Sequence, residues 1–157
     1  MNAPGMSAAG IERAFAQVSL LGRLSGRQRA RLAELATTRS YQAGSVIVRQ
    51  GDTSMALYVV LSGNVRIERE TDGGASIAIS EVGAHGFFGE MGLLDDEPRA
   101  ATVVAVEDTE CALLAKWDFQ NELRNDSDIA LGVLPVLTRR IRELDELLAK
   151  ARSPQRT

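Results

Sequence analysis

Residues 87–102 read Phe-Phe-Gly-Glu-Met-Gly-Leu-Leu-Asp-Asp-Glu-Pro-Arg-Ala-Ala-Thr and form the most informative segment of the chain. Gly89 has no Cβ, so the backbone at this position can approach a ligand closely. Residues 91–94 are long enough for one helical turn, whose first amides lack helical partners and favour an anion. Arg99 adds a planar, permanently charged fork that suits phosphate oxygens. The stretch therefore predicts an anion pocket.

Glu90 indicates what else this pocket would hold. Its carboxylate repels a phosphate, so its favoured partner beside one is a hydroxyl donor such as a ribose 2′-OH. A phosphate next to a sugar hydroxyl indicates a nucleotide. The plainer alternative is a tight turn with a solvated Arg99 and an acidic rim, but several residue types at matched spacing favour the pocket.

These residues resemble the phosphate-binding cassette of the cyclic nucleotide-binding domain family, which includes catabolite activator proteins, protein kinase A regulatory subunits and cyclic-nucleotide-gated channels. Further upstream, Gly51-Asp52, Leu57-Tyr58-Val59-Val60 and Gly63-Asn64-Val65 are similar to a second signature of that family. The likeness runs from about residue 21 to residue 148. It implies a mainly β fold, an eight-stranded antiparallel jelly roll with N-terminal helices and a long C-terminal helix.

The resemblance also implies roles for individual residues. Glu90 would hold the ribose 2′-OH, Arg99 the exocyclic phosphate oxygens, and amides around Gly89 and Gly92 would complete the cradle. The candidate ligand-binding residues are Val65, Phe88, Gly89, Glu90, Met91, Gly92, Leu93, Arg99, Ala100, Ala101 and Arg140. One departure concerns Arg99: kinase regulatory subunits have a second Gly-Asp whose Asp braces the arginine, and Ser54-Met55 stands there instead.

The ligand that the resemblance implies is a cyclic mononucleotide, with no separate cofactor and no metal. In the family a Thr directly after the cassette Arg is associated with guanine, and Ala100 at this place favours cAMP over cGMP. Catabolite activators contact adenine through a Thr-Ser pair, and Leu144-Asp145 at the matching positions leaves the base contacts open. A lid like that of the kinase subunits would use Val136, Leu137 or Arg140.

The bulk composition fits one ordinary globular domain. The chain has 157 residues, of which 45% are hydrophobic and 25% charged, and its net charge of −3 gives no general nucleic-acid footprint. Cys111 is the single cysteine, so no internal disulfide forms and a reducing, cytoplasmic location is expected. Residues 1–10 do not read as a signal peptide, and no apolar run reaches membrane-spanning length.

The spacing of the hydrophobic residues changes along the chain and divides it into three parts. Residues 1–22 are expected to form a tail and a first helix over residues 8–21, because Ile11, Phe15 and Val18 recur at helical spacing. Residues 23–125 hold a second helix, opened by a Ser-x-x-Gln capping box at Ser25, and the β-roll. The expected strands cover residues 46–48, 55–61, 65–68, 76–79, 102–106 and 111–114.

Residues 126–152 form the third part, a lid or dimerisation helix capped by Asp126 or Ser127. Apolar residues step along it by three and four, the a/d spacing of a coiled coil; this leucine seam comprises Leu134, Leu137, Ile141, Leu144 and Leu148. Pro135 lacks a backbone donor and is expected to kink the helix. The short seam either packs on the chain's own barrel or pairs with a second copy in a homodimer.

The favoured function is a regulatory sensor that converts cyclic nucleotide binding into movement of its C-terminal helix, read by a second copy or an effector protein. The alternative is a degenerate family member that serves as a protein-interaction module, but an unpaired buried Arg99 would be costly to keep. An enzyme is not expected. A metal-dependent one would need several imidazole and carboxylate ligands, and His85 is the single histidine.

Direct DNA binding is not expected either. Catabolite activators follow the long helix with a helix-turn-helix, and this sequence stops a few residues after Ala151. Arg23, Arg27, Arg29 and Arg31 gather around the second helix, but no aromatic residues are interleaved with them. A solvated helix face is therefore the preferred interpretation of these arginines.

Overall fold

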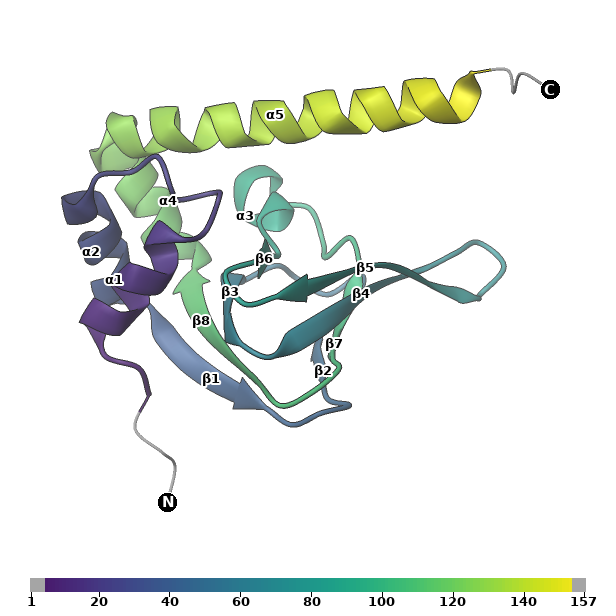
Figure 1. Cartoon of the computed structure of the whole chain (residues 1–157), viewed down its shortest axis with the longest axis horizontal. Coiled ribbons are helices and arrows are strands. Elements are labelled where there is room, and N and C mark those ends of the chain that lie inside the picture. The colour runs from purple at the N-terminus through teal and green to yellow at the C-terminus, as the bar shows by residue number, and fades with distance from the viewer. Residues whose placement is uncertain (1–4, 154–157) are drawn as a thin grey trace.

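The computed structural model describes residues 5–153 of the chain. A roll of eight antiparallel strands forms the centre of the molecule, in two four-stranded sheets. Helices from both ends of the chain gather at one end of the roll, and one long helix passes over it (Figure 1).

The strand order identifies the roll as a jelly roll. The first sheet has the order β1-β8-β3-β6, formed by Thr37–Tyr41, Thr109–Ala115, Ala56–Ser62 and Phe87–Phe88. The second has the order β2-β7-β4-β5, formed by Val46–Val48, Thr102–Ala105, Asn64–Glu70 and Ser76–Gly83. All paired strands are antiparallel, and the chain changes sheet between consecutive strands everywhere except between β4 and β5. The expected jelly roll is confirmed.

Strand β3 separates two hydrophobic cores. Its apolar run is buried on both faces, and alternate side chains point to opposite sides of the sheet. Leu57, Val59 and Leu61 pack against the helices, whereas Tyr58 and Val60 pack inside the roll. A strand buried on both faces holds the neighbouring β6, and hence the start of the cassette, at a fixed place.

Two strands have no counterpart among those expected from the sequence. Strand β1 is polar and mostly exposed, so its Thr-Thr-Arg-Ser-Tyr sequence carries no apolar period, yet it pairs along its whole length with β8. Strand β6 has only two residues, too few to show any period. Pairing with a buried partner, rather than their own composition, places both strands in the sheet.

The N-terminal helices differ from expectation at one end. Helix α2 (Gly26–Leu35) opens with the predicted capping box between Ser25 and Gln28. Helix α1 (Ala8–Ala16) ends five residues before the predicted end at Leu21. Beyond it the amides of Val18 and Leu21 bond to carbonyls three residues back, so successive turns replace the last helical turns. Of the tail predicted at residues 1–7, residues 1–4 lie outside the described residues.

Helix α4 (Lys116–Asn125) leads directly into α5 (Ser127–Arg152), and the Asp126 side chain caps α5 by accepting from the Asp128 amide. Helix α5 is continuous through Pro135, and the kink expected at this residue stays a prediction. Its first half is anchored in the helical core, where Ile129 and Val133 are buried and Val136 and Leu137 are partly buried. Of all helices within residues 5–153, α5 included, not one has the length and apolar character needed to span a membrane.

The leucine seam is largely free of the roll. Leu137 packs against the helical core, but Leu134, Ile141, Leu144 and Leu148 are each more than half exposed. Within the described residues the seam therefore does not pack along the chain's own barrel, which was one of its two expected positions.

Candidate functional site

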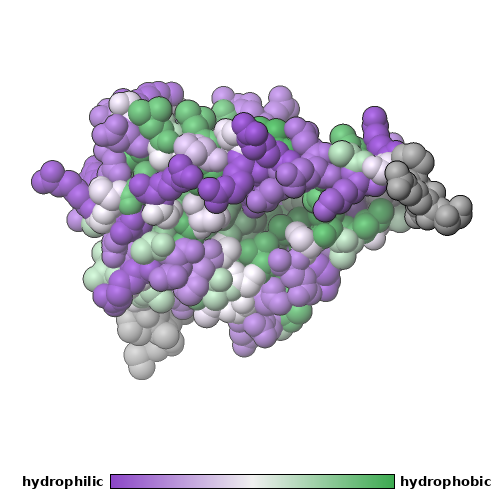
Figure 2. Space-filling view, turned by 45° about the horizontal axis from the view of Figure 1, so that its top comes forward, coloured by the Kyte–Doolittle hydropathy of each residue, from purple (hydrophilic) through white to green (hydrophobic). Residues whose placement is uncertain are grey.

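A cavity of about 470 Å³ opens between the second sheet, the short helix α3 (Met91–Asp95) and α5. Its volume lies within the usual range of small-molecule sites. Figure 2 shows polar side chains along the outer face of α5 and hydrophobic residues in the hollow beneath it. Most of the predicted residues line the cavity: Phe88, Gly89, Glu90, Met91, Gly92, Arg99, Ala100, Ala101 and Arg140.

Arg99 is a buried cation at the base of this cavity, with 7% of its surface exposed. Its Nη2 donates to the carbonyl of Ala56 at 3.0 Å and its Nη1 to that of Gly89 at 3.4 Å. Among residues 5–153 no carboxylate forms an ion pair with it, which agrees with the missing Asp beside Ser54. Burial lowers the pKa of Arg99, because the contacts of the guanidinium do not fully replace the hydration that it has lost.

An aromatic pair supports the guanidinium from one side. The Arg99 Cζ lies 5.5 Å from the centroid of the Tyr58 ring, which stacks on Phe88 at 4.9 Å and 8°. The main chain of Arg99 is held separately, because its amide donates to the Asp52 carbonyl at 2.7 Å and its carbonyl accepts from the Gly51 amide. The Gly-Asp and Tyr positions of the upstream signature therefore hold the arginine of the cassette.

Gly89 is a glycine for two physical reasons. Its φ of +84° lies in the left-handed region that side chains disfavour. In addition, a Cβ at this position would overlap Arg99 Nη1 and lie 3.2 Å from the Ala56 carbonyl. The absence of a side chain at residue 89 is therefore a condition for the observed position of Arg99.

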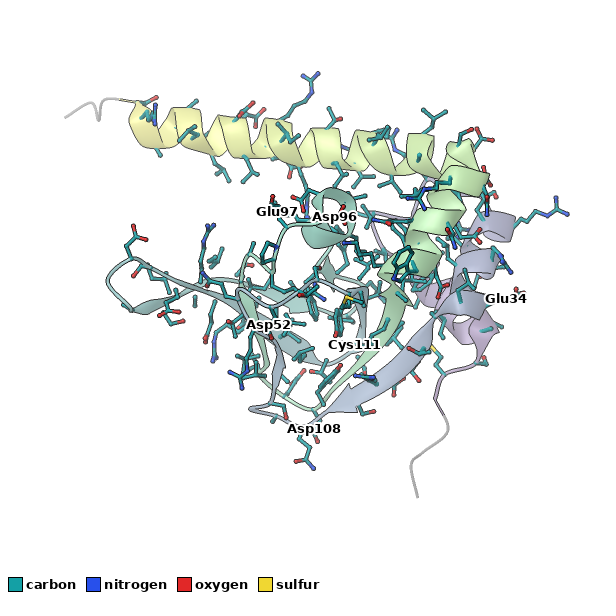
Figure 3. The ribbon with its side chains drawn as sticks, turned by 180° about the vertical axis from the view of Figure 1, so that it is seen from behind. Glu34, Asp52, Asp96, Glu97, Asp108 and Cys111 are labelled. Carbon is teal, nitrogen blue, oxygen red and sulfur yellow. The ribbon has the colours of Figure 1, made fainter. Side chains whose placement is uncertain are left out.

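Helix α3 follows directly and is tied to the helices behind it. Its single turn is closed by a bond from the Leu93 amide to the Glu90 carbonyl at 3.2 Å. The Leu93 carbonyl accepts from Gln120 of α4 at 2.8 Å, and Lys116 of α4 pairs with Asp96. Asp96 and Glu97 lie beside α3, beneath α5 (Figure 3). The cassette turn is thus connected to α4.

Glu90 joins the cassette to α5. Its carboxylate accepts from Arg140 Nη1, and the Arg140 guanidinium lies 4.5 Å from the centroid of the Phe87 ring. The Glu90 side chain is largely buried, whereas Arg140 is about half exposed at the cavity mouth. Residues far apart in sequence thus meet at the point where α5 crosses the pocket.

The structure places two predicted ligand-binding residues away from the cavity. Val65 is fully buried inside the roll with Phe88 and Val103, and Leu93 is buried in the helical core. Their apolar side chains support the pocket walls from behind. Val136 and Leu137, the expected lid residues next to Arg140, likewise pack against the helical core.

Ten lining residues were not among the predicted set: Val48, Ser54, Ile67, Arg69, Ile79, Ser80, Val82, Phe87, Val103 and Leu144. Ile67 and Arg69 could have been found from the sequence, because alternate residues of strand β4 point to the same face and these two lie two positions apart. Leu144 matches a base-contacting position of catabolite activators, but leucine offers no hydrogen bond. Ser54 carries no signal in the sequence pattern.

Comparison with known proteins decides the family. The family model described as "Cyclic nucleotide-binding domain" matches residues 38–126, more than half of the chain. The chain belongs to this family. The family is defined by binding of cyclic nucleotides and by regulation rather than by catalysis.

Two curated relatives illustrate the relationship of this cyclic nucleotide-binding domain. The Cyclic AMP receptor protein of Thermus thermophilus is 42% identical over 107 residues, which cover 68% of this chain and 50% of the relative. The cAMP-dependent protein kinase regulatory subunit of Dictyostelium discoideum is 38% identical over 106 residues, covering 66% and 32%. The chain therefore spans half, or less, of the length of these relatives.

Solved structures agree on the fold. The catabolite activator protein of Thermus thermophilus superimposes with a TM-score of 0.77 at 36% identity, covering 85% of this chain and 62% of that one. The regulatory domain of Toxoplasma gondii PKA, solved with cAMP, gives a TM-score of 0.76 at 25% identity, covering 87% and 50%. Both the jelly roll and the family assignment from the cassette are confirmed.

The single cysteine and the single histidine lie outside the cavity of this cyclic nucleotide-binding domain. Cys111 is fully buried in the roll (Figure 3), and burial raises the pKa of its thiol to about 12, so it stays protonated. His85 is exposed in a turn with a φ of 69°. No set of three or more potential metal ligands occurs within residues 5–153.

Proposed function

We propose that the chain is a cAMP-binding regulatory domain, in which Arg99 holds the cyclic phosphate, Glu90 the ribose and α5 responds to the ligand. The observation that carries this proposal is the buried guanidinium of Arg99, which lines a cavity large enough for a nucleotide and forms no ion pair within residues 5–153. A desolvated cation needs an anion, and the phosphate of the ligand supplies one. The relatives named for cAMP support the choice of ligand.

The wall opposite the cassette fits a base. Ile67, Ile79 and Val82 of the second sheet line it, and Leu144 of α5 faces the same cavity. An apolar wall accepts the face of an adenine without selecting its edge. Selection between bases would then come from Ala100, next to the phosphate.

Calorimetric titration with cAMP and cGMP tests the function and the base choice together. We expect cAMP to bind more tightly, because Ala100 offers no hydroxyl to the guanine amino group. Ala100→Thr should narrow the difference by about 1 kcal/mol, the net value of one hydrogen bond. A tighter complex of the unaltered chain with cGMP contradicts the base assignment, and no binding of either nucleotide contradicts the function.

Substitution of Glu90 tests whether its carboxylate binds the ribose 2′-OH. Its second carboxylate oxygen is available beside the one bound to Arg140, and a charge-assisted bond to the 2′-OH is worth about 1.5–3 kcal/mol. We therefore expect Glu90→Gln to weaken cAMP about tenfold while 2′-deoxy-cAMP changes little.

Arg140→Gln is the matched control for this substitution. It breaks the same ion pair but leaves the Glu90 carboxylate in place, so it should change the affinity for both ligands by the same factor. If Glu90→Gln also weakens the two ligands equally, its carboxylate does not hold the 2′-OH.

We infer that helix α5 responds to the ligand. Its first turns are anchored by Ile129 and Val133, while Arg140 and Leu144 face the cavity. A ligand shifts a helix only by binding one of its positions more tightly, and the contacts of Arg140 and Leu144 supply such a difference.

Hydrogen exchange of the amides from residue 137 to residue 148, with and without cAMP, measures this response. We expect slower exchange in the complex, and truncation after Pro135 should weaken binding. The amides of β8, buried in the core, serve as an internal reference that should not change. Unchanged exchange in α5 at saturating cAMP would leave the chain a binder without a moving helix.

The exposed part of the leucine seam is the proposed contact with other chains. Leu134, Ile141 and Leu148 present an apolar stripe at coiled-coil spacing. Such a stripe suits a second copy of this chain or a helix of an effector protein. Because Leu144 belongs both to the seam and to the cavity, ligand binding and partner binding would share one residue.

A further inference from the structure

Ser54 has a buried hydroxyl with nothing to bond to. The residue is 2% exposed, and its Oγ has no hydrogen-bond partner among the described residues. Buried polar groups are nearly always paired, so an orphan of this kind indicates a missing partner. Asn64 Oδ1 is also unpaired, but the Asn64 amide still donates to Glu81 at 3.1 Å. The only polar group of the Ser54 side chain has no such compensation.

The surroundings of Ser54 are those of the anion cradle. Ser54 lines the same cavity as Arg99, Gly89 and Gly92. A Cβ placed on Gly92 would overlap both Cβ and Oγ of Ser54 and lie 2.9 Å from the Glu97 carbonyl. The serine side chain therefore packs directly against the first turn of α3 and occupies the space that Gly92 leaves free.

The charged groups near the Ser54 hydroxyl determine which kind of partner it can bind. Arg99 is a donor and cannot accept the Ser54 hydrogen, and the Glu90 carboxylate, which accepts from Arg140, does not bond to Ser54 either. A hydroxyl can turn its hydrogen toward any acceptor that enters the cavity. An anionic oxygen next to Arg99 is the acceptor that suits both groups.

We propose that Ser54 is a further phosphate-binding residue, whose hydroxyl donates to an exocyclic oxygen of the cyclic phosphate held by Arg99. This inference rests on the proposed function and adds a residue to its phosphate site. Ser54 stands where kinase regulatory subunits have a Gly-Asp step, whose Asp braces the arginine. In this chain the same position would contact the ligand directly.

Calorimetry on Ser54→Ala tests the inference with cAMP and the two phosphorothioate diastereomers, in which sulfur replaces one or the other exocyclic oxygen. Sulfur is a weak acceptor. We expect the variant to bind cAMP about tenfold more weakly, the value of one charge-assisted hydrogen bond. The loss should be much smaller for the one diastereomer whose sulfur faces residue 54.

Thermal unfolding separates this role from a structural one. Without ligand, Ser54→Ala removes an unpaired buried hydroxyl, so the melting temperature should stay the same or rise. Ser62→Ala is the matched control, because Ser62 is exposed at the end of β3 and outside the cavity; its affinity for cAMP should not change.

Two results would overturn the inference. One is an unchanged affinity of Ser54→Ala for cAMP, whether or not its melting temperature falls, and the other is an equal loss for all three ligands. Each leaves the proposed function standing, since the unaltered chain still binds cAMP. If the unaltered chain binds no cyclic nucleotide, the proposed function fails as well.

Discussion

Replacement of Arg99 by alanine is expected to weaken cAMP binding by at least about tenfold while the jelly roll stays folded. A charge-assisted bond to phosphate is worth about 1.5–3 kcal/mol, and leaving the phosphate unpaired in a buried site adds to the loss. The variant also removes the donor to the Ala56 and Gly89 carbonyls. Calorimetry measures the affinity, and circular dichroism checks the fold.

Arg39→Ala is the control for the loss of one positive charge, because Arg39 is exposed on β1 away from the cavity. It should bind cAMP like the unaltered chain. Arg99→Lys keeps the charge but lacks the fork that reaches two carbonyls. Its affinity for cAMP should therefore lie between that of Arg99→Ala and that of the unaltered chain. Equal affinity of Arg99→Ala and the unaltered chain would show that the cassette does not hold the phosphate.

Gly89→Ala is expected to weaken cAMP binding about as much as Arg99→Ala, although it removes no group that touches the ligand. The new Cβ would overlap Arg99 Nη1, so the guanidinium must leave its place beside the Ala56 carbonyl. Since both substitutions act on one interaction, the double variant should bind no more weakly than either single one.

Gly44→Ala is the matched control for this substitution. Gly44 has a φ of +88°, close to that of Gly89, but a Cβ there meets nothing within 4 Å. It reproduces the backbone strain without the clash, so it should lower the melting temperature and leave the affinity for cAMP unchanged. Fully additive losses for the Gly89 and Arg99 substitutions would mean that the glycine acts in some other way.

The part of the site that could be predicted from the sequence is the part whose chemistry lies close together in the chain. Gly89, Glu90 and Arg99 fall within eleven consecutive residues, and each has a side-chain property that its position requires. The helical turn predicted at residues 91–94 is confirmed by α3 for the same reason. Local constraints of this kind do not depend on which distant strand lies next to them.

What could not be predicted depends on tertiary neighbours. The polar strand β1 exists because β8 pairs with it, and Leu93 turned out to be buried because a helical core lies behind the cassette. Nothing near Ser54 in the chain indicates that Gly92 lies against it. Family resemblance alone indicates Arg140 as a site residue. Its contact with Glu90 joins residues that are 50 positions apart in the sequence, so no local pattern could predict it.

Helix α5 has the geometry of a lever with its fulcrum at one end. Its 26 residues correspond to about 39 Å at 1.5 Å per residue. The fulcrum is at Ile129 and Val133, and Arg140 touches the cassette about 13 Å farther along. By the ratio of these arms, a 1 Å displacement of Arg140 would move the end at Arg152 by between about 2 and 3 Å. The exposed half of the helix would thus enlarge a small rearrangement at the ribose into a shift that a neighbouring molecule can detect.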